Sequence, residues 1–460
     1  MRKSTCVRIV CLLTSLLLLL CAIPFSIYAA EENYLPSMDE SSSVYLKHLE
    51  SDRVVCSKDE NYLVGAGSTV KIMAGLLFCE KLEAYSQQSI IITQELYDAI
   101  PHSHGRSLKL TVGEETTIEH LLYAAICGSY NDAFYVLAAF TSGSVAAFVE
   151  EMQARATSMG LKNTVFEDVS GIVDGSRTTA AEVAQMALVA YQNPYYMAIC
   201  NTVSFEFFSS HKAKSHYNNN KLICVYQDQK YYNKKCIGMS AGSTARDGNC
   251  VVTVAKQEDQ TYVCVVMGGK EKDGIEFGYR VANRVIDWVF DSYTYMQILV
   301  PNTKICTVDV ATSDTASVLD VIVKDSLFAY LPKGLELGKD ITYSIRLAET
   351  ELEAPVQKDQ FVGYVAVLYN GQVLGTAPLY TAGEASRSSI GSGLGAIRSW
   401  LENRAVIAGI VFFVVGVTAY VVIAYILQRR RHSRWDRYFS DKVELPDYMR
   451  TPSREKKDKK

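Results

Sequence analysis

Two serines, a lysine and an asparagine stand in this chain at spacings that suit nucleophilic catalysis. Ser68 and Lys71 open an apolar run, so a helix there places the hydroxyl and the amine on one face, one turn apart. Ser129 and Asn131 lie in a second apolar run. A serine hydroxyl is a poor nucleophile until a base takes its proton, and a lysine becomes such a base when burial lowers its pKa.

These four residues predict the parts of an acyl-transfer site. Ser68 would attack a carbonyl carbon while Lys71 accepts the proton of the Ser68 hydroxyl. Ser129 would relay a proton to the leaving amine, and Asn131 would hold an amide of the substrate. The backbone N–H of Ser68 and one N–H of an edge strand would bind the developing oxyanion. Each pair alone is a weak signal, because a helix cap or a local bend explains it; their order, spacing and apolar context favour catalysis.

Two helices and a sheet edge must position these residues. The apolar run 72–82 predicts a buried helix directly after the first pair, and a second helix is expected to extend to residue 139, with residues 129–131 within it or interrupting it. The β-branched runs 250–254 and 262–267 predict adjacent antiparallel strands. The stretch just before them reads Gly-Met-Ser-Ala-Gly-Ser-Thr, and its candidate substrate-binding residues are Ser240, Gly242, Ser243 and Thr244.

Together these stretches resemble the serine D-alanyl-D-alanine carboxypeptidases, the low-molecular-mass penicillin-binding proteins. The resemblance extends from about residue 44 to 290 and includes the Ser-x-x-Lys, Ser-x-Asn and altered Lys-Thr-Gly motifs. It implies an α/β (α+β) fold of the β-lactamase/transpeptidase type, with a five-stranded antiparallel sheet, a helical subdomain and a site in the cleft between them. It also implies removal of the terminal D-alanine from a peptidoglycan pentapeptide through an acyl-enzyme on Ser68, and binding of β-lactams.

The chain departs from the family pattern at Ser240 and Ala241, which stand in place of Lys and Thr. In the family, the lysine attracts the terminal carboxylate of the substrate and adds positive charge near the catalytic amine, while the threonine hydroxyl binds the same carboxylate. Loss of a charged hydrogen bond costs roughly 1.5–3 kcal/mol, or about 10- to 150-fold in affinity or rate. The resemblance therefore implies weakened activity. Arg246, Lys234 or Lys235 are candidates to supply the missing charge, and a solvated surface role is the alternative for each.

The two ends of the chain predict export and anchoring. Residues 1–30 have the basic start, apolar centre and small final residues of a signal peptide, with an uncleaved anchor as the alternative. Residues 405–427 carry no charge and, as a helix of about 34 Å, are long enough to cross a bilayer. Three arginines follow at 429–431, so the basic tail 428–460 is expected in the cytoplasm and the preceding part outside.

The sequence pattern divides the exported part into domains. Residues 31–295 mix helix and strand signals, and form the expected carboxypeptidase-like domain. Residues 296–383 show short apolar alternations, with Asn370-Gly371 as a type I′ hairpin signal, and predict a small all-β domain. Residues 384–404 are expected to form a linker because the stretch 384–396 is rich in serine and glycine. The protein is thus expected at the cell membrane, with its catalytic domain on the cell-wall side.

Composition excludes several other classes. The net charge of −4 and the lack of a basic stripe argue against nucleic-acid binding. Most cysteines outside the signal peptide lie in apolar runs without metal-ligand spacing, so buried free thiols are expected, and neither metal nor cofactor.

Two rival functions stay open. One is a catalytically impaired protein that binds peptidoglycan or a partner, against which the intact Ser68–Lys71 pair argues. The other is a β-lactamase, although no Glu-x-x-x-Asn motif is present.

Overall fold

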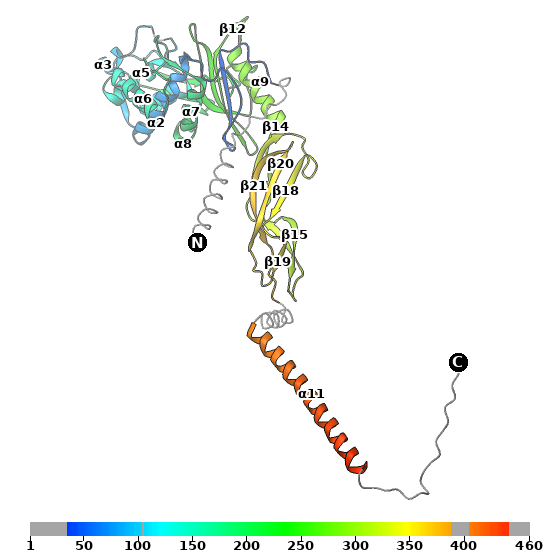
Figure 1. The fold of residues 1–460 in the computed structure, drawn as a ribbon. Helices are drawn as coiled ribbons and strands as arrows, with labels where there is room; N and C mark the ends of the chain where they lie inside the picture. The colour runs from blue at the N-terminus through cyan, green and yellow to red at the C-terminus, as the bar shows by residue number, and fades with distance from the viewer. Residues whose placement is uncertain (1–34, 104, 388–403, 441–460) are drawn as a thin grey trace. The chain divides into compact units, whose positions relative to one another are not determined.

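The computed structural model of the chain describes residues 35–103, 105–387 and 404–440 (Figure 1). The chain divides into two compact units. The first extends to Gln297 and includes Phe328–Asp340, and the second comprises Ile298–Leu327 and the residues from Ile341 onward. The predicted signal peptide, most of the predicted linker and the end of the basic tail lie outside the described residues.

A five-stranded antiparallel sheet forms the centre of the first unit and confirms the sheet that the resemblance implies. Its spatial order is β2 (Arg53–Lys58), β1 (Ser43–His48), β11 (Gln260–Gly269), β10 (Gly248–Gln257) and β9 (Cys236–Thr244). The two predicted strands 250–254 and 262–267 are β10 and β11, and Val252 pairs with Val265. The altered motif therefore lies on the edge strand β9.

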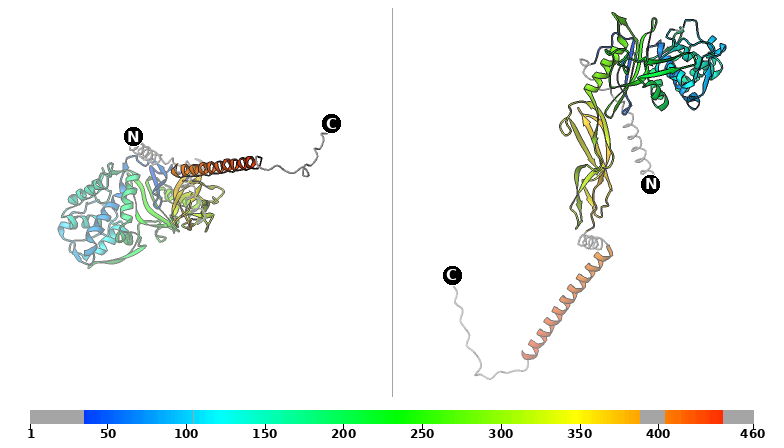
Figure 2. Two further views of the ribbon diagram at one scale, coloured as in Figure 1. Left: turned by 60° about the horizontal axis from the view of Figure 1, so that its bottom comes forward. Right: turned by 180° about the vertical axis from the view of Figure 1, so that it is seen from behind.

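Helices cover both faces of this sheet, which explains why its central strands are apolar on both sides. Val252 and Val265 face the core of the helical part, whereas the neighbouring Val251 and Val266 pack in a second core with α9 (Phe277–Ser292). Because side chains alternate along a strand, each strand supplies both cores. The views in Figures 1 and 2 agree that α9 lies on one side of the sheet and the other helices on the opposite side.

The helical part surrounds one central helix. Helix α2 (Val70–Leu82) is apolar around almost its whole circumference and is buried, as expected of a helix that other helices enclose. Its neighbours in the helical core are α4 (Ile118–Leu122), α5 (Asn131–Ser142), α6 (Val145–Ser158), α7 (Ala180–Tyr191) and α8 (Pro194–Cys200). The predicted buried helix at 72–82 is confirmed, and its start carries Ser68 and Lys71.

The second unit contains a six-stranded sheet, and its described residues up to 387 contain no helix. Its order is β18 (Ile341–Leu347), β20 (Phe361–Tyr369), β21 (Gln372–Thr381), β16 (Val318–Val323), β15 (Lys304–Ala311) and β19 (Glu351–Glu353). Asn370 and Gly371 join β20 to β21, and both have positive φ, of 48° and 77°. A type I′ turn needs this conformation at both central residues, so the predicted hairpin is confirmed. A separate two-stranded sheet, most of whose residues belong to the first unit, pairs β14 (Tyr293–Leu299) with β17 (Leu327–Pro332).

Helix α11 (Arg404–Ser440) contains the predicted membrane span. Across the described residues, no single helix has both the length and the apolar composition to cross a bilayer, and Val411–Leu427 is a shorter apolar stretch. In the part of the chain that the structure describes, only α5 and α6, which meet at 85°, pass such a test as a bent pair.

The cysteines match their predicted state. All nine in the described part of the chain are free thiols, and eight of them are buried.

Candidate active site

Ser68 occupies a short 3-10 turn, η2 (Gly67–Thr69), that leads into α2. Its side chain is only 5% exposed, and its hydroxyl donates to the carbonyl oxygen of Gly242 on β9 at 3.4 Å. The hydroxyl of Ser240 donates in turn to the carbonyl oxygen of Ser68 at 3.3 Å. The nucleophile candidate is thus held between the start of a buried helix and an edge strand.

Two glycines allow this close approach. A Cβ on Gly242 would lie 2.8 Å from the Cβ of Ser68, so a side chain at 242 would displace the serine or the strand. Gly171 has φ of +78°, and a Cβ there would overlap the carbonyl of Gly67. The close approach of Ser68 therefore requires a glycine at position 242. This requirement is independent of which residues stand at positions 240 and 241.

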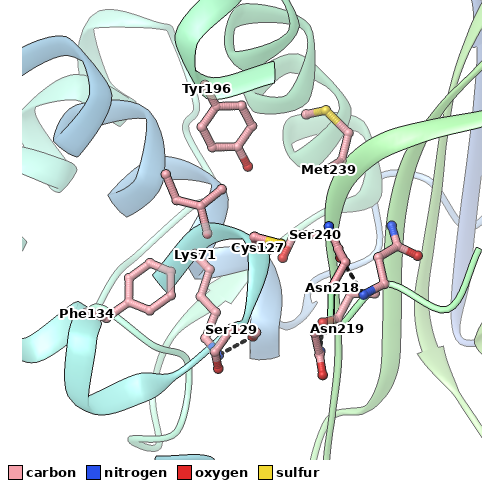
Figure 3. Close-up of a pocket in the computed structure, with 12 residues that line it drawn as sticks. Lys71, Cys127, Ser129, Phe134, Tyr196, Asn218, Asn219, Met239 and Ser240 are labelled. Atoms are coloured by element: carbon pink, nitrogen blue, oxygen red, sulfur yellow. Dashed lines mark hydrogen bonds between the residues drawn. The ribbon is translucent and has the colours of Figure 1, made fainter. Parts of the chain in front are cut away.

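Lys71 lies one turn into the same helix segment and is buried. Its Nζ donates to the Oγ of Ser129 at 2.7 Å and to the carbonyl oxygen of Ser129 at 3.1 Å, as Figure 3 shows. Burial lowers the pKa of Lys71 to about 7, helped by the charge of Arg106 and opposed by that of Asp168. An amine with this pKa is about half neutral at pH 7 and increasingly neutral above it, and a neutral amine can accept a proton.

Ser129 lies where the expected long helix is interrupted. After α4, one π-helical turn, η4 (Tyr123–Cys127), ends the first segment, and α5 begins at Asn131. Ser129 itself has a φ of +57°, in the left-handed region that a non-glycine residue adopts at a cost of about 1–3 kcal/mol. This conformation turns the serine toward Lys71. Of the two possibilities that the sequence allowed, residues 129–131 interrupt the helix.

One cleft of about 600 Å³ brings most of the predicted site residues together. Those that line it are Ser68, Lys71, Ser129, Asn131, Gly242, Ser243, Thr244 and Arg246. Ser240 lines instead an adjoining small cavity of about 10 Å³, together with Lys71, Ser129 and Asn219 (Figure 3). Hydroxyls, amides and cations therefore converge on one space. Across the described residues, no cluster of side chains is suited to a metal ion.

The β9 side of the site lacks the charge that the resemblance implies. Ala241 is 3% exposed, and its side chain packs in the apolar core with Val251 and Tyr279, away from the cleft. Ser240 faces the site, but its hydroxyl is already bonded to Ser68. Neither residue carries a charge to bind a carboxylate.

The three predicted replacement cations have other partners or positions. Arg246 lines the cleft, but its guanidinium pairs with Asp174 and makes two hydrogen bonds to Asp247, at 2.8 and 2.7 Å. Lys235 pairs with Asp287 of α9 at 2.7 Å, and Lys234 is exposed outside the cleft. The surface alternative suits Lys234, whereas the side chain of Lys235 is only 17% exposed in its pair with Asp287.

Sequence reasoning missed two residues that shape the site. Arg106 lines the cleft, and its guanidinium carbon lies 4.6 Å from the ring centroid of Tyr130. Asp168 is buried and accepts hydrogen bonds from the backbone N–H groups of Gly171 at 2.8 Å and Ile172 at 3.1 Å, so it orders the loop against the Ser68 turn. Both residues lie in loops without periodic pattern, so only the Ser/Gly-rich setting of Arg106 hinted at a loop near the site.

Comparisons with known proteins agree with this geometry. The family model described as D-alanyl-D-alanine carboxypeptidase matches residues 31–271, and that described as penicillin-binding protein 5, C-terminal domain, matches residues 293–387. The D-alanyl-D-alanine carboxypeptidase DacF of Bacillus subtilis is 25% identical over 349 residues, which cover 74% of this chain and 84% of that protein. DacC of Escherichia coli is 27% identical over 360 residues, covering 76% of this chain and 86% of its own.

Solved structures show the same fold. The carboxypeptidase DacD from Francisella tularensis superposes with a TM-score of 0.57 at 17% identity, over 77% of this chain and 96% of its own. Penicillin-binding protein 5 from Haemophilus influenzae gives a TM-score of 0.54 at 22% identity, over 77% of this chain and 99% of its own. From the matched family model, which spans more than half of its residues, this chain belongs to the D-alanyl-D-alanine carboxypeptidase family.

Proposed function

We propose that this protein is a serine D-alanyl-D-alanine carboxypeptidase that trims peptidoglycan stem peptides through an acyl-enzyme on Ser68. One observation carries the proposal: the buried amine of Lys71, with a pKa of about 7, lies one turn from Ser68 and is bonded to the hydroxyl of Ser129 in the same cleft. A neutral amine that is bonded to one serine hydroxyl and lies one helical turn from another serine can move protons in both halves of an acyl transfer.

In the first half of the reaction, the Oγ of Ser68 attacks the carbonyl carbon of the penultimate D-alanine, and Lys71 accepts the hydroxyl proton. The backbone N–H of Ser68 and one N–H of β9 stabilise the oxyanion. The C–N bond then breaks, and the proton passes from Lys71 through Ser129 to the leaving D-alanine amine. Asn131, Gly242, Ser243 and Thr244, which line the cleft, are the proposed substrate-binding residues.

In the second half, water attacks the ester carbonyl while Lys71 takes a proton from it, and the Ser68 oxygen leaves and recovers its proton. Before the attack in the first half, the Ser68 hydroxyl must give up its 3.4 Å bond to the Gly242 carbonyl, a long contact that substrate can displace. We also propose that activity is weaker than with Lys-Thr at positions 240 and 241, because Ser240 and Ala241 offer no charge on β9.

We further propose a membrane-anchored arrangement. Its parts are a signal peptide (1–30), the carboxypeptidase-like domain (31–295), an all-β domain (296–383), a linker (384–404), a single transmembrane helix (405–427) and a cytoplasmic tail (428–460). The apolar side chains that line the helix from Val411 to Leu427 support it, since they are exposed, Phe412 to 84%. The catalytic domain would then face the cell wall, where peptidoglycan, β-lactams and the membrane are its partners.

D-alanine release from a pentapeptide mimic tests the activity, with the full chain in detergent and its Ser68→Ala variant as the blank. The proposal predicts release by the unaltered chain alone. Binding of the peptide without release in either chain would favour the impaired binding protein, and rapid opening of penicillin with regeneration of free enzyme would favour the β-lactamase.

A further inference from the structure

Three cations of the described residues line the cleft, and their surroundings differ. Lys71 is buried and its amine is bonded to Ser129. Arg246 is neutralised by Asp174 and Asp247. The guanidinium of Arg106 is exposed, and within the described part of the chain it pairs with no carboxylate. Arg106 is therefore the cleft cation whose charge is available to an incoming anion.

The loop that carries Ser129 holds Arg106 from two sides. The carbonyl oxygen of Arg106 accepts the backbone N–H of Asn131 at 2.9 Å, and its Nη2 donates to the hydroxyl of Tyr130 at 3.4 Å. The guanidinium also lies over the Tyr130 ring, 4.6 Å from its centroid. A guanidinium has five N–H donors, and these contacts use one, so a planar fork remains for a carboxylate.

The tyrosine beneath Arg106 is itself fixed. Its hydroxyl is 2.7 Å from the Nδ1 of His216, on β8 (Ala213–Tyr217), and the two rings meet edge to face at 5.1 Å. Tyr130 is only 9% exposed. A cation over a rigid aromatic face loses less side-chain freedom on binding than a free arginine would.

In the family, the lysine at position 240 also adds positive charge near the catalytic amine. The position of Arg106 suits this second role as well. The charge of Arg106 is close enough to Lys71 to lower the pKa of that amine. An anion held by Arg106 would lie beside Ser129, next to the leaving end of the substrate in the proposed mechanism. One arginine on the helical side can thus provide the carboxylate attraction and the positive field that β9 no longer supplies.

We propose that Arg106 binds the terminal carboxylate of the substrate and determines the preference for peptides with a free C-terminus, in place of the lysine that the family has at position 240. The inference rests on the proposed carboxypeptidase function. It makes Arg106 a specificity-determining residue on a different side of the cleft from β9.

A matched pair of peptides tests the proposal: an N-acyl-D-Ala-D-Ala with a free carboxylate and the same peptide as its C-terminal amide. Dissociation constants are measured on the full-length Ser68→Ala chain, and kcat/KM on the active chain at the pH plateau of each variant. We expect the chain with unaltered Arg106 to prefer the free acid over the C-terminal amide by at least about tenfold. Arg106→Gln should remove that preference and leave the amide within about twofold, while Arg106→Lys should keep part of it.

Lys109→Gln is the matched control. Lys109 is an exposed cation three residues further along the loop that does not line the cleft, so its loss should leave the preference unchanged. Three results would overturn the role of Arg106. The preference for the acid could be unchanged in Arg106→Gln, it could be lost in Arg246→Gln instead, or the starting chain could bind the acid and the amide equally well. Arg106-dependent binding of the acid without any turnover would keep that role and refute the carboxypeptidase.

Discussion

The two walls of the cleft have kept different amounts of the family pattern. On the helical wall, Ser68, Lys71 and Ser129 are all present, and the amine is bonded to the second serine. On the β9 wall, the glycine remains, but Ser240 and Ala241 stand where the family has a lysine and a threonine, so the charge is absent and the hydroxyl at position 241 is absent as well. The difference follows from what each wall does. Proton transfer needs groups within hydrogen-bond distance, whereas a carboxylate can be attracted by a cation on any side of the cleft.

The largest effect is expected when the intact wall loses its base. Lys71→Met keeps the length and apolar stem of the side chain but removes the amine, so Ser68 has no proton acceptor. We expect D-alanine release to fall by at least about a thousandfold, within the range of general-base removal. Release assays on full-length protein check this, with circular dichroism to confirm folding. Retention of more than a tenth of the activity would mean that another group accepts the proton.

A backbone change on the altered wall should come next. Gly242→Ala places a Cβ 2.8 Å from the Cβ of Ser68, so the nucleophile or the strand must shift. A misplacement of this kind costs about a hundredfold in rate. We expect that loss in kcat/KM, with Gly371→Ala at the hairpin of the second unit as a control that leaves kcat/KM unchanged. Normal kinetics in Gly242→Ala would show that the two walls are less tightly fitted than described.

The pH dependence should report the helical wall alone. Lys71 must be neutral to act as a base, and its pKa is about 7. Below that pH the amine is protonated, so kcat/KM should fall about tenfold for each further unit and level off above it. In Arg106→Gln, loss of a positive neighbour should raise the pKa of Lys71 and move this limb to higher pH. If the acidic limb of the kcat/KM profile stays at the same pH in Arg106→Gln, the charge of Arg106 does not influence the pKa of Lys71.

Returning a lysine to β9 should have a smaller effect, and one that depends on the background. Ser240→Lys would extend toward the small cavity beside Lys71 and Ser129. We expect it to raise D-alanine release at least about tenfold in the Arg106→Gln chain, where the charge is missing, and less in the unaltered chain. Equal gains in both backgrounds would indicate that Arg106 contributes nothing to carboxylate binding.

The neighbouring change should not help at all. Ala241→Thr would insert a hydroxyl into the apolar core with Tyr279 rather than into the cleft. We expect no gain in release and a loss of about 1–3 kcal/mol in the free energy of unfolding, from overpacking and from the buried hydroxyl. Urea denaturation measures the loss. An increase in release would mean that residue 241 turns toward the cleft.

Local pattern was enough to predict much of this molecule. The Ser-x-x-Lys helix start, the strand pair β10–β11 and the Asn370-Gly371 turn follow from spacing and from backbone preference. The five-stranded sheet followed from the family resemblance, and the buried thiols from apolar surroundings. The helix start, the strand pair and the turn depend on residues close together in the chain.

Features that depend on distant contacts could not be predicted in the same way. The left-handed Ser129 follows a π-helical turn, and the sequence left open whether the helix continues through residues 129–131 or is interrupted there. The direction of Ala241 depends on which face of β9 meets the helical part, and a single-residue shift would reverse it. Arg106 reaches the cleft through a loop, and its proposed role depends on carboxylates that, among the described residues, pair with Arg246 but not with Arg106.

Covalent labelling of Ser68 tests the central claim most directly. The full-length chain in detergent is incubated for hours with millimolar benzylpenicillin, and intact mass followed by peptide mapping locates the adduct. The account predicts one penicilloyl group on the peptide that contains Ser68, absent from Ser68→Ala and strongly reduced in Lys71→Met. A folded chain that gains no mass, or an adduct that persists in Ser68→Ala, would contradict the claim that Ser68 and Lys71 form a working nucleophile.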